Sequence, residues 1–198
     1  MTTLVWFRQD LRLADNPALA DAVKAGEVVP VFIWAPEEEA PWAPGAASRW
    51  WLHHSLTALD ESLKEAGSKL VIRAGDSLAE LKKLMKETGA DRVVWNRRYE
   101  PAVIARDAKI KKELKADSFN AALLHEPWTV RTMEGKPYQV FTPYWRACLS
   151  MPPPPKPLPA PKKIPSPSKF PPSGSVAGLK LLPKIKWDGG FATEWTPD

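Results

Sequence analysis

Short apolar runs alternate with segments of helical periodicity along the first two thirds of the chain. Runs rich in Val, Ile and Leu that lack polar alternation are typical of strands covered on both faces of a parallel sheet. Between these runs, apolar residues recur at helical spacing. The pattern predicts strands at residues 4–7, 28–34, 69–73, 92–95 and 118–124. It therefore indicates an α/β fold: a Rossmann-like, doubly wound, five-stranded parallel sheet with helices on both faces.

Polar residues and prolines predict where the helices begin. Asn16 is placed to cap the first helix, and Pro17 suits the first helical position, where a missing N–H costs nothing. Ser48 is the expected cap of a long second helix. Ser77 and Glu80 have the spacing of a capping box at the start of the third helix.

The composition changes after the predicted sheet, which divides the chain into three parts. We assign residues 1–130 to the α/β domain, 131–150 to an aromatic segment, and 151–198 to a linker rich in Pro and Lys. Proline occupies 11 of the 21 positions from 152 to 172. Such a tract cannot form a helix or a central strand, so it is expected to be a semi-rigid extended spacer.

The net charge of +5 lies mostly in this linker. Residues 150–186 hold seven lysines and no acidic residue, while residues 1–149 carry only +1. A lysine-dotted proline tract is usually solvated, so we favour that interpretation. Non-specific DNA binding by the tail remains an alternative, and it would show as a steep dependence on salt.

Several classes of function are not indicated by the sequence. Cys148 is the only cysteine, so we expect a reducing, cytoplasmic environment without disulfides. There is no apolar run of about 20 residues and no basic-then-apolar leader, so neither membrane spanning nor export is expected. No phosphate-binding glycine loop is present, and the three histidines lack metal-ligand spacing. We therefore expect no catalytic residue and no metal site.

Polar and aromatic residues follow the predicted strands, where an open α/β sheet holds its ligands. Together they would suit a flat, conjugated ligand, bound by stacking and by hydrogen bonds at the ring edge. Asp10 and Arg12 are expected instead to pair with each other or with a neighbouring domain. Gly75 and Asp76, which follow the third strand, would complete the crevice. The residues expected to bind the ligand there are Arg8, Trp34, Ala35, Pro36, Asn96, Arg97 and Tyr99.

Four stretches, in order along the chain, resemble the DNA photolyase/cryptochrome family. Residues 6–17 match its opening, Trp-Phe-Arg-x-Asp-Leu-Arg-Leu-x-Asp-Asn-Pro, and residues 95–107 resemble the turn after its fourth strand. Residues 135–145 resemble its Gly-x-Pro-Tyr-x-Val-Phe box, and residues 187–191 resemble the end of its interdomain linker. The combination is most similar to class I photolyases of the bacterial type.

This resemblance implies an antenna domain of a light-driven enzyme that splits cyclobutane pyrimidine dimers. In such enzymes the N-terminal α/β domain holds an antenna chromophore, and a helical C-terminal domain holds FAD and the flipped-out lesion. The chain would lack that helical domain, so we expect no repair by the chain alone. The implied partners are the missing helical domain and damaged DNA, and the parent enzyme is expected to be a monomer without membrane contact.

The resemblance leaves the antenna partly open. The Asn-Glu pair of folate-binding members falls on Ala102 and Val103, so that match fails. Deazaflavin-binding members have an arginine that aligns with Arg49, so Arg49 joins the candidate site. Their acidic residue aligns with Arg98, so that second match fails. An 8-hydroxy-deazaflavin or a flavin is therefore favoured over methenyltetrahydrofolate, and an altered or empty pocket stays open.

Other functions remain compatible with the same residues. One is the N-terminal half of a cryptochrome-like blue-light sensor, and another is a stand-alone Rossmann-like nucleotide-binding protein. Neither the lesion, a cyclobutane dimer or a 6-4 product, nor the choice between photolyase and cryptochrome is decided by the sequence.

Overall fold

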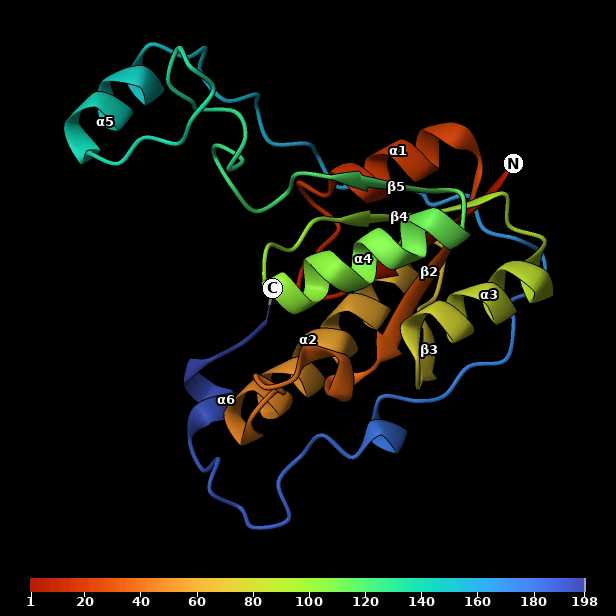
Figure 1. Ribbon diagram of the computed structural model, residues 1–198. Coiled ribbons are helices and arrows are strands. Elements are labelled where there is room, and N and C mark those ends of the chain that lie inside the picture. Colours follow the sequence, from red (N-terminus) through yellow and green to blue (C-terminus); the bar gives the residue numbers. More distant parts are fainter. Residues whose placement is uncertain (198) are drawn as a thin grey trace.

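The computed structural model describes residues 1–197, so Asp198, the end of the predicted linker, lies outside the described residues. Five parallel strands form one sheet in the order β3-β2-β1-β4-β5 (Figure 1). This confirms the predicted parallel α/β sheet. The fifth strand is shorter and begins earlier than predicted. The strands are β1 (Thr2–Phe7), β2 (Glu27–Trp34), β3 (Val71–Ala74), β4 (Arg92–Asn96) and β5 (Ala116–Phe119).

Helices cover both faces of the sheet, as the doubly wound pattern predicts (Figure 1). Side chains alternate along each strand, so β1 sends Val5 and Phe7 into one core and Leu4 and Trp6 into the other. Helices α1 (Pro17–Ala25) and α2 (Ala46–Glu65) pack on the Phe7 side, whereas α3 (Ser77–Thr88) and α4 (Pro101–Glu113) pack on the other. The remaining helical turns are η1 (Pro36–Glu39), α5 (Phe141–Leu149), η2 (Ala177–Leu179) and α6 (Phe191–Glu194).

The helix caps were predicted correctly in one case and wrongly in two. The Asn16 side chain accepts a hydrogen bond from the backbone N of Leu19 at 3.0 Å, as expected. Helix α2 instead begins after Gly45, which leaves Ser48 inside its first turn. Helix α3 is capped by the carboxylate of Asp76, and the Ser77 hydroxyl donates to Glu38 at 2.6 Å. At α3, a tertiary acceptor takes the Ser77 hydroxyl and the neighbouring Asp76 carboxylate caps the helix, so local spacing alone did not identify that cap.

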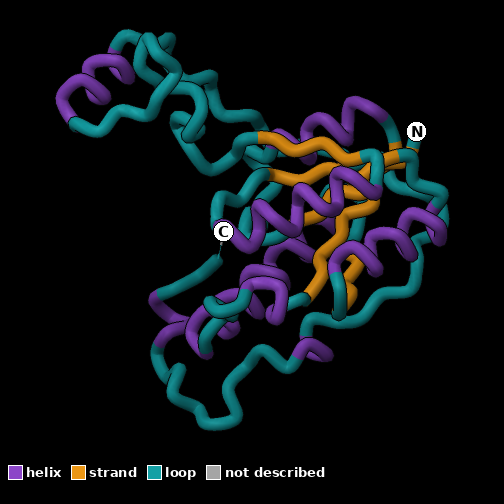
Figure 2. The backbone as a smooth tube through the Cα atoms, viewed as in Figure 1, coloured by secondary structure: helices purple, strands orange, loops and turns teal. Residues whose placement is uncertain are grey.

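The predicted solvated linker is instead seated against the α/β domain, and we call residues 151–188 the strap. It follows the domain as an extended chain, drawn as loop in Figure 2 except for the single turn η2. Ile164 N donates to the Ala66 carbonyl at 2.9 Å, and Val28 N donates to the Pro165 carbonyl at 2.7 Å. Gly174 N donates to Ile72 O at 2.9 Å, so the strap also covers the free edge of β3. The tract is therefore seated on the domain from Leu158 onward, whereas residues 152–157 and the lysines are solvated as expected.

Residues 131–150 project away from the sheet and carry α5 (Figures 1 and 2). No residue of α5 is buried, and Phe141 is 72% exposed. This helix is too short to fold stably by itself, so its apolar side chains indicate a surface that packs against something else. None of the helices in the described residues has the length and apolar character needed to cross a membrane.

Candidate antenna site

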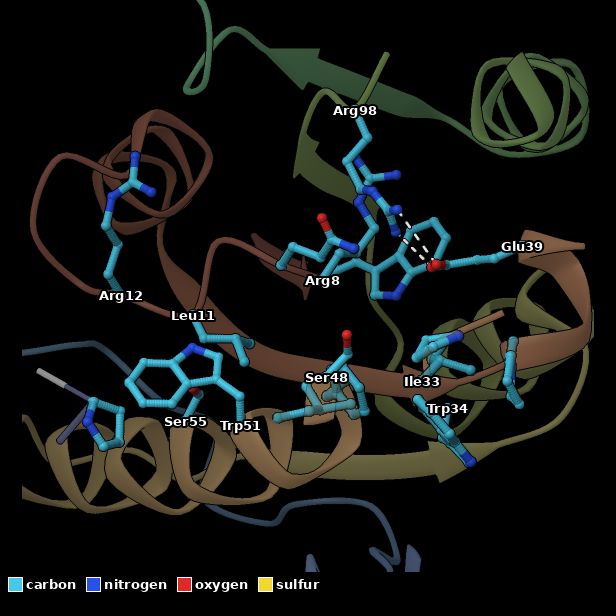
Figure 3. A pocket seen from close by; sticks show the side chains of 18 of the residues that line it. Arg8, Leu11, Arg12, Ile33, Trp34, Glu39, Ser48, Trp51, Ser55 and Arg98 are labelled. Atoms are coloured by element: carbon cyan, nitrogen blue, oxygen red, sulfur yellow. Dashed lines mark hydrogen bonds and ion pairs between the residues drawn. The ribbon is translucent and has the colours of Figure 1, made fainter. Parts of the chain in front are cut away.

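A cavity of about 590 Å³ opens at the carboxyl ends of β1 and β2 (Figure 3). This is the edge where an open α/β sheet holds its ligands, and the volume suits a small organic molecule. Trp34 at the end of β2 lines it, as do Ala35 and Pro36 directly after the strand, all three of them predicted site residues. Arg8 and Gln9 contribute from the end of β1.

Helix α2 supplies the wall that the sequence analysis missed. Ser48, Trp51, Leu52 and Ser55 all line the cavity, and their spacing of three, four and seven residues places them on one helical face. The Trp51 ring is 40% exposed, so its face is available for stacking. The signal was present in the sequence as a second, mixed stripe beside the buried leucines of the same helix.

The pair formed by Arg98 and Glu39 fixes the short helix η1 at the rim of the cavity (Figure 3). Arg98 Nη1 lies 2.5 Å from Glu39 Oε1 and its Nη2 lies 2.8 Å from Glu100 Oε1. Burial opposes the charged form of Arg98, but the hydrogen bonds to both carboxylates raise the pKa of its guanidinium. Arg98 stands where the resemblance to deazaflavin-binding members called for an acidic residue. In this chain its charge is balanced by Glu39 and Glu100.

Arg8 lines the cavity, but its guanidinium is already engaged. Its side chain is buried, with Nη1 2.7 Å from Asp107 Oδ2, and Nη2 donates to the Asn96 carbonyl. The guanidinium also lies 5.1 Å from the centre of the Trp6 ring. Burial lowers the pKa of Arg8, while Asp107 opposes that effect. Arg8 therefore fixes the end of β1 against α4 through both Nη atoms, while its buried Nε has no hydrogen-bond partner among the described residues.

The predicted crevice is divided, because Asn96, Arg97 and Tyr99 line a second, more polar cavity beside the first. Arg97 Nε lies 2.6 Å from Glu126 Oε1, which also accepts from the Tyr99 hydroxyl at 2.7 Å. Burial raises the pKa of Tyr99, and its bond to Glu126 adds to that rise. Glu126 comes from the loop after β5, so only the tertiary structure brings it to this group.

Asp10 and Arg12 do not pair with each other as expected. The Asp10 carboxylate accepts from Arg8 N at 3.0 Å and from the Asn96 amide at 2.5 Å. Arg12 donates to backbone carbonyls, among them Ala121 O at 3.0 Å. Both residues therefore stabilise the loop that follows β1.

Three predicted residues lie outside the two cavities. Arg49 is exposed on α2 and is not among the residues that line the cavity. Positions two apart on a helix face different directions, so Arg49 does not share the face of Trp51. Gly75 and Asp76 are exposed at the end of β3, and Asp76 caps α3. The expectation that these three line the crevice is thus not met by the geometry.

The site combines apolar walls with a polar rim whose arginines are largely neutralised by carboxylates. Such a site binds and orients a flat ligand by stacking and edge hydrogen bonds. Among the described residues there is no group of three His, Cys, Asp or Glu that could hold a metal ion.

Comparison with known proteins agrees with the fold and with the four motifs. The family model described as DNA photolyase matches residues 3–162. A deoxyribodipyrimidine photo-lyase of Agrobacterium fabrum is 46% identical over 98% of this chain and 41% of its own length. Cryptochrome-1 of Arabidopsis thaliana is 49% identical over 76% of this chain and 23% of its own length.

A solved structure extends the agreement to three dimensions. The crystal structure of a class III photolyase from Agrobacterium tumefaciens is 45% identical, with a TM-score of 0.90 over 99% of this chain and 42% of that one. The chain thus spans about two fifths of these two photolyases. The class I assignment suggested by the motifs stays a prediction, since that relative is of class III. On the family model, the sequence identity and the shared fold, the chain belongs to the DNA photolyase family.

Proposed function

We propose that this chain is the antenna-binding part of a light-driven DNA repair enzyme that splits cyclobutane pyrimidine dimers. The observation that carries the proposal is the cavity at the ends of β1 and β2, with Trp51 on one wall and the Arg98–Glu39 pair at its rim. Proteins of this family bind chromophore cofactors. FAD and the lesion would be bound by a helical domain outside these residues.

An 8-hydroxy-deazaflavin or a flavin is the proposed antenna. Trp51, Leu11 and Leu52 provide an apolar surface for a flat ring system, and Gln9 and Ser48 supply polar groups at its edge. When bound, the pigment would absorb light and pass the excitation on. The chain's own contribution would be to orient the ring and exclude water, so no residue here is assigned a catalytic role.

The position of Arg49 changes the argument for this pigment. That arginine motivated the deazaflavin assignment, yet it is exposed and lies outside the cavity lining. Support for a flat tricyclic pigment over methenyltetrahydrofolate therefore comes from the stacking wall and from the absence of the folate pair at Ala102 and Val103.

Exposed apolar side chains support the helical companion domain. They gather on α5 and around α6 near the end of the chain. Single exposed apolar residues are common on protein surfaces, but a group of them indicates an interaction surface. A domain packed on these elements would remove them from water. The residues concerned are Val140, Phe141, Trp145, Leu149, Ile185, Phe191 and Trp195.

The test begins with the absorption spectrum of the purified chain. A band beyond the tryptophan region is expected, and Trp51→Ala should remove it while Arg49→Gln retains it. With the helical domain supplied in the same chain, blue light should split the pyrimidine dimers in damaged DNA. A purified chain that takes up no pigment, even from added riboflavin, would overturn the antenna assignment.

A cryptochrome-like light sensor is the second candidate, and the 49% identity to cryptochrome-1 of Arabidopsis thaliana favours it. The two functions share the antenna cavity and differ in what the companion domain does. Pigment binding without any repair by the full-length protein would select the sensor. A stand-alone nucleotide-binding protein is less well supported, because it would not need the exposed apolar group on α5.

A further inference from the structure

The strap buries two apolar anchors and turns its lysines outward, while Leu182, Ile185 and Trp187 near its end stay exposed. Ile164 is 1% exposed and belongs to the core cluster beside α2, as does the buried Leu181. Between residues 150 and 186 there are seven lysines and no acidic residue. All seven are exposed: Lys156, Lys162, Lys163, Lys169, Lys180, Lys184 and Lys186.

Several of these lysines are held next to a buried anchor. Lys162 and Lys163 directly precede Ile164, whose backbone N is bonded to Ala66 O. Lys169 precedes Phe170, which packs against the second core cluster, and Lys180 precedes Leu181. The lysines therefore do not drift on a solvated tail, because the backbone beside them is fixed to the domain.

The charge of this band is not neutralised by ion pairs. No strap lysine lies within salt-bridge distance of a carboxylate among residues 1–197, although Lys64, Lys82 and Lys83 on the helices are all paired. Glu65 lines the same groove as Lys162 without forming an ion pair with it. A fixed, unpaired row of cations beside a nearly neutral domain attracts polyanions.

We propose that the strap is a sequence-independent contact surface for the phosphate backbone of duplex DNA. In an extended chain, Lys163 and Lys169 stand on the order of 20 Å apart, so each reaches a separate group of phosphates. Lysine ammonium groups bind phosphates as point charges and read no bases. No exposed large apolar side chain lies between Lys162 and Lys180, so this stretch offers little for insertion into lipid, which favours DNA over a membrane. This inference does not depend on a pigment in the cavity.

The test measures binding of the full chain to a fluorescent, undamaged duplex of about 20 base pairs as NaCl is varied between about 50 and 200 mM. The wild type is compared with the variant K162Q/K163Q/K169Q. The matched control K82Q/K83Q/K86Q removes the same charge from α3, outside the strap. All these lysines are exposed or surface-paired, so thermal midpoints should agree among the three proteins.

The strap variant should bind the duplex more weakly, with a slope of log K against log salt reduced by about 2 to 3. The control should keep the slope of the wild type to within about 1. Equal loss in both variants would mean that only net charge matters, and it would overturn the proposal. No duplex binding at low salt, or tighter binding to vesicles of phosphatidylserine and phosphatidylcholine than to DNA, would overturn it as well. Because pigment absorbance reports on the cavity separately, either result leaves the antenna assignment to its own test.

Discussion

Oδ2 of Asp107 lies 2.7 Å from Nη1 of Arg8, and both side chains are buried although 99 residues separate them. The pair joins the end of β1 to α4 at the edge of the sheet where the two cavities open. Arg106 also lies 3.1 Å from the other Asp107 oxygen. Asp107 thus holds two arginines beside the candidate site.

Removing this carboxylate should destabilise the protein strongly. Asp107→Ala leaves the Arg8 guanidinium buried without its counter-charge, and we expect a loss of about 3 to 5 kcal/mol in the free energy of unfolding. Urea denaturation measures it. Glu113→Gln is the control, since Glu113 pairs with Lys82 in solvent and its loss should change stability far less. Similar losses for the two variants would contradict the structural role of Asp107.

Trp51 should determine pigment affinity, whereas Arg49 should not. Trp51→Ala removes the stacking surface of the cavity and should weaken binding of added riboflavin at least tenfold, equivalent to about 1.4 kcal/mol. Arg49→Gln changes an exposed side chain outside the lining and should leave the dissociation constant within about twofold. Fluorescence titration gives both values. A larger effect of Arg49 than of Trp51 would place the pigment elsewhere.

The Arg98–Glu39 pair should influence the rim of the cavity more than the stability of the fold. Glu39→Gln removes a charged partner of Arg98 and frees η1, so we expect faster pigment dissociation with a loss of unfolding free energy of only about 1 kcal/mol. Stopped-flow dissociation and denaturation measure the two effects. Glu37→Gln, on the exposed side of the same turn, is the control. An unchanged dissociation rate in Glu39→Gln would exclude this role for the pair.

The strap should behave as part of the folded domain. Ile164→Ala creates a cavity under the strap and should cost about 2 to 4 kcal/mol, as for other buried aliphatic residues. Leu158→Ala removes a side chain that is 36% exposed and should cost less than about 1.5 kcal/mol. If the two losses were equal and small, the strap would be a solvated linker after all.

Acid should weaken the group around Glu126. Burial alone would raise the pKa of Glu126, but the hydrogen bonds from Arg97 and Tyr99 outweigh it and lower that pKa. Its contribution to stability is therefore complete above its unfolded pKa and is lost as the pH falls through the folded value. The wild type should exceed Glu126→Gln in unfolding free energy by about 1 kcal/mol near neutral pH, and the difference should shrink as the pH falls below the ordinary pKa of a glutamate. Thermal unfolding over this range is the measurement, and a difference independent of pH would contradict it.

The alternation of strands and helices along the α/β domain could be predicted from the sequence because the signals are local. Buried parallel strands have continuous apolar runs, as at residues 28–34, and their helices have apolar residues at helical spacing. Asn16 and Pro17 likewise act within one helical turn. The family resemblance rests on the same kind of local signal, and the comparisons bear it out.

Tertiary structure alone decided which side chains are free to act at the site. Arg8 and Arg97 are equally polar in the sequence, but their partners Asp107 and Glu126 lie 99 and 29 residues away and occupy them in the folded chain. The burial of Ile164 against the domain could not be predicted for the same reason. Proline content indicates an extended backbone but not which surface that backbone packs against. Periodicity reports what one segment prefers by itself, whereas pairing and burial depend on segments that meet only when the chain has folded.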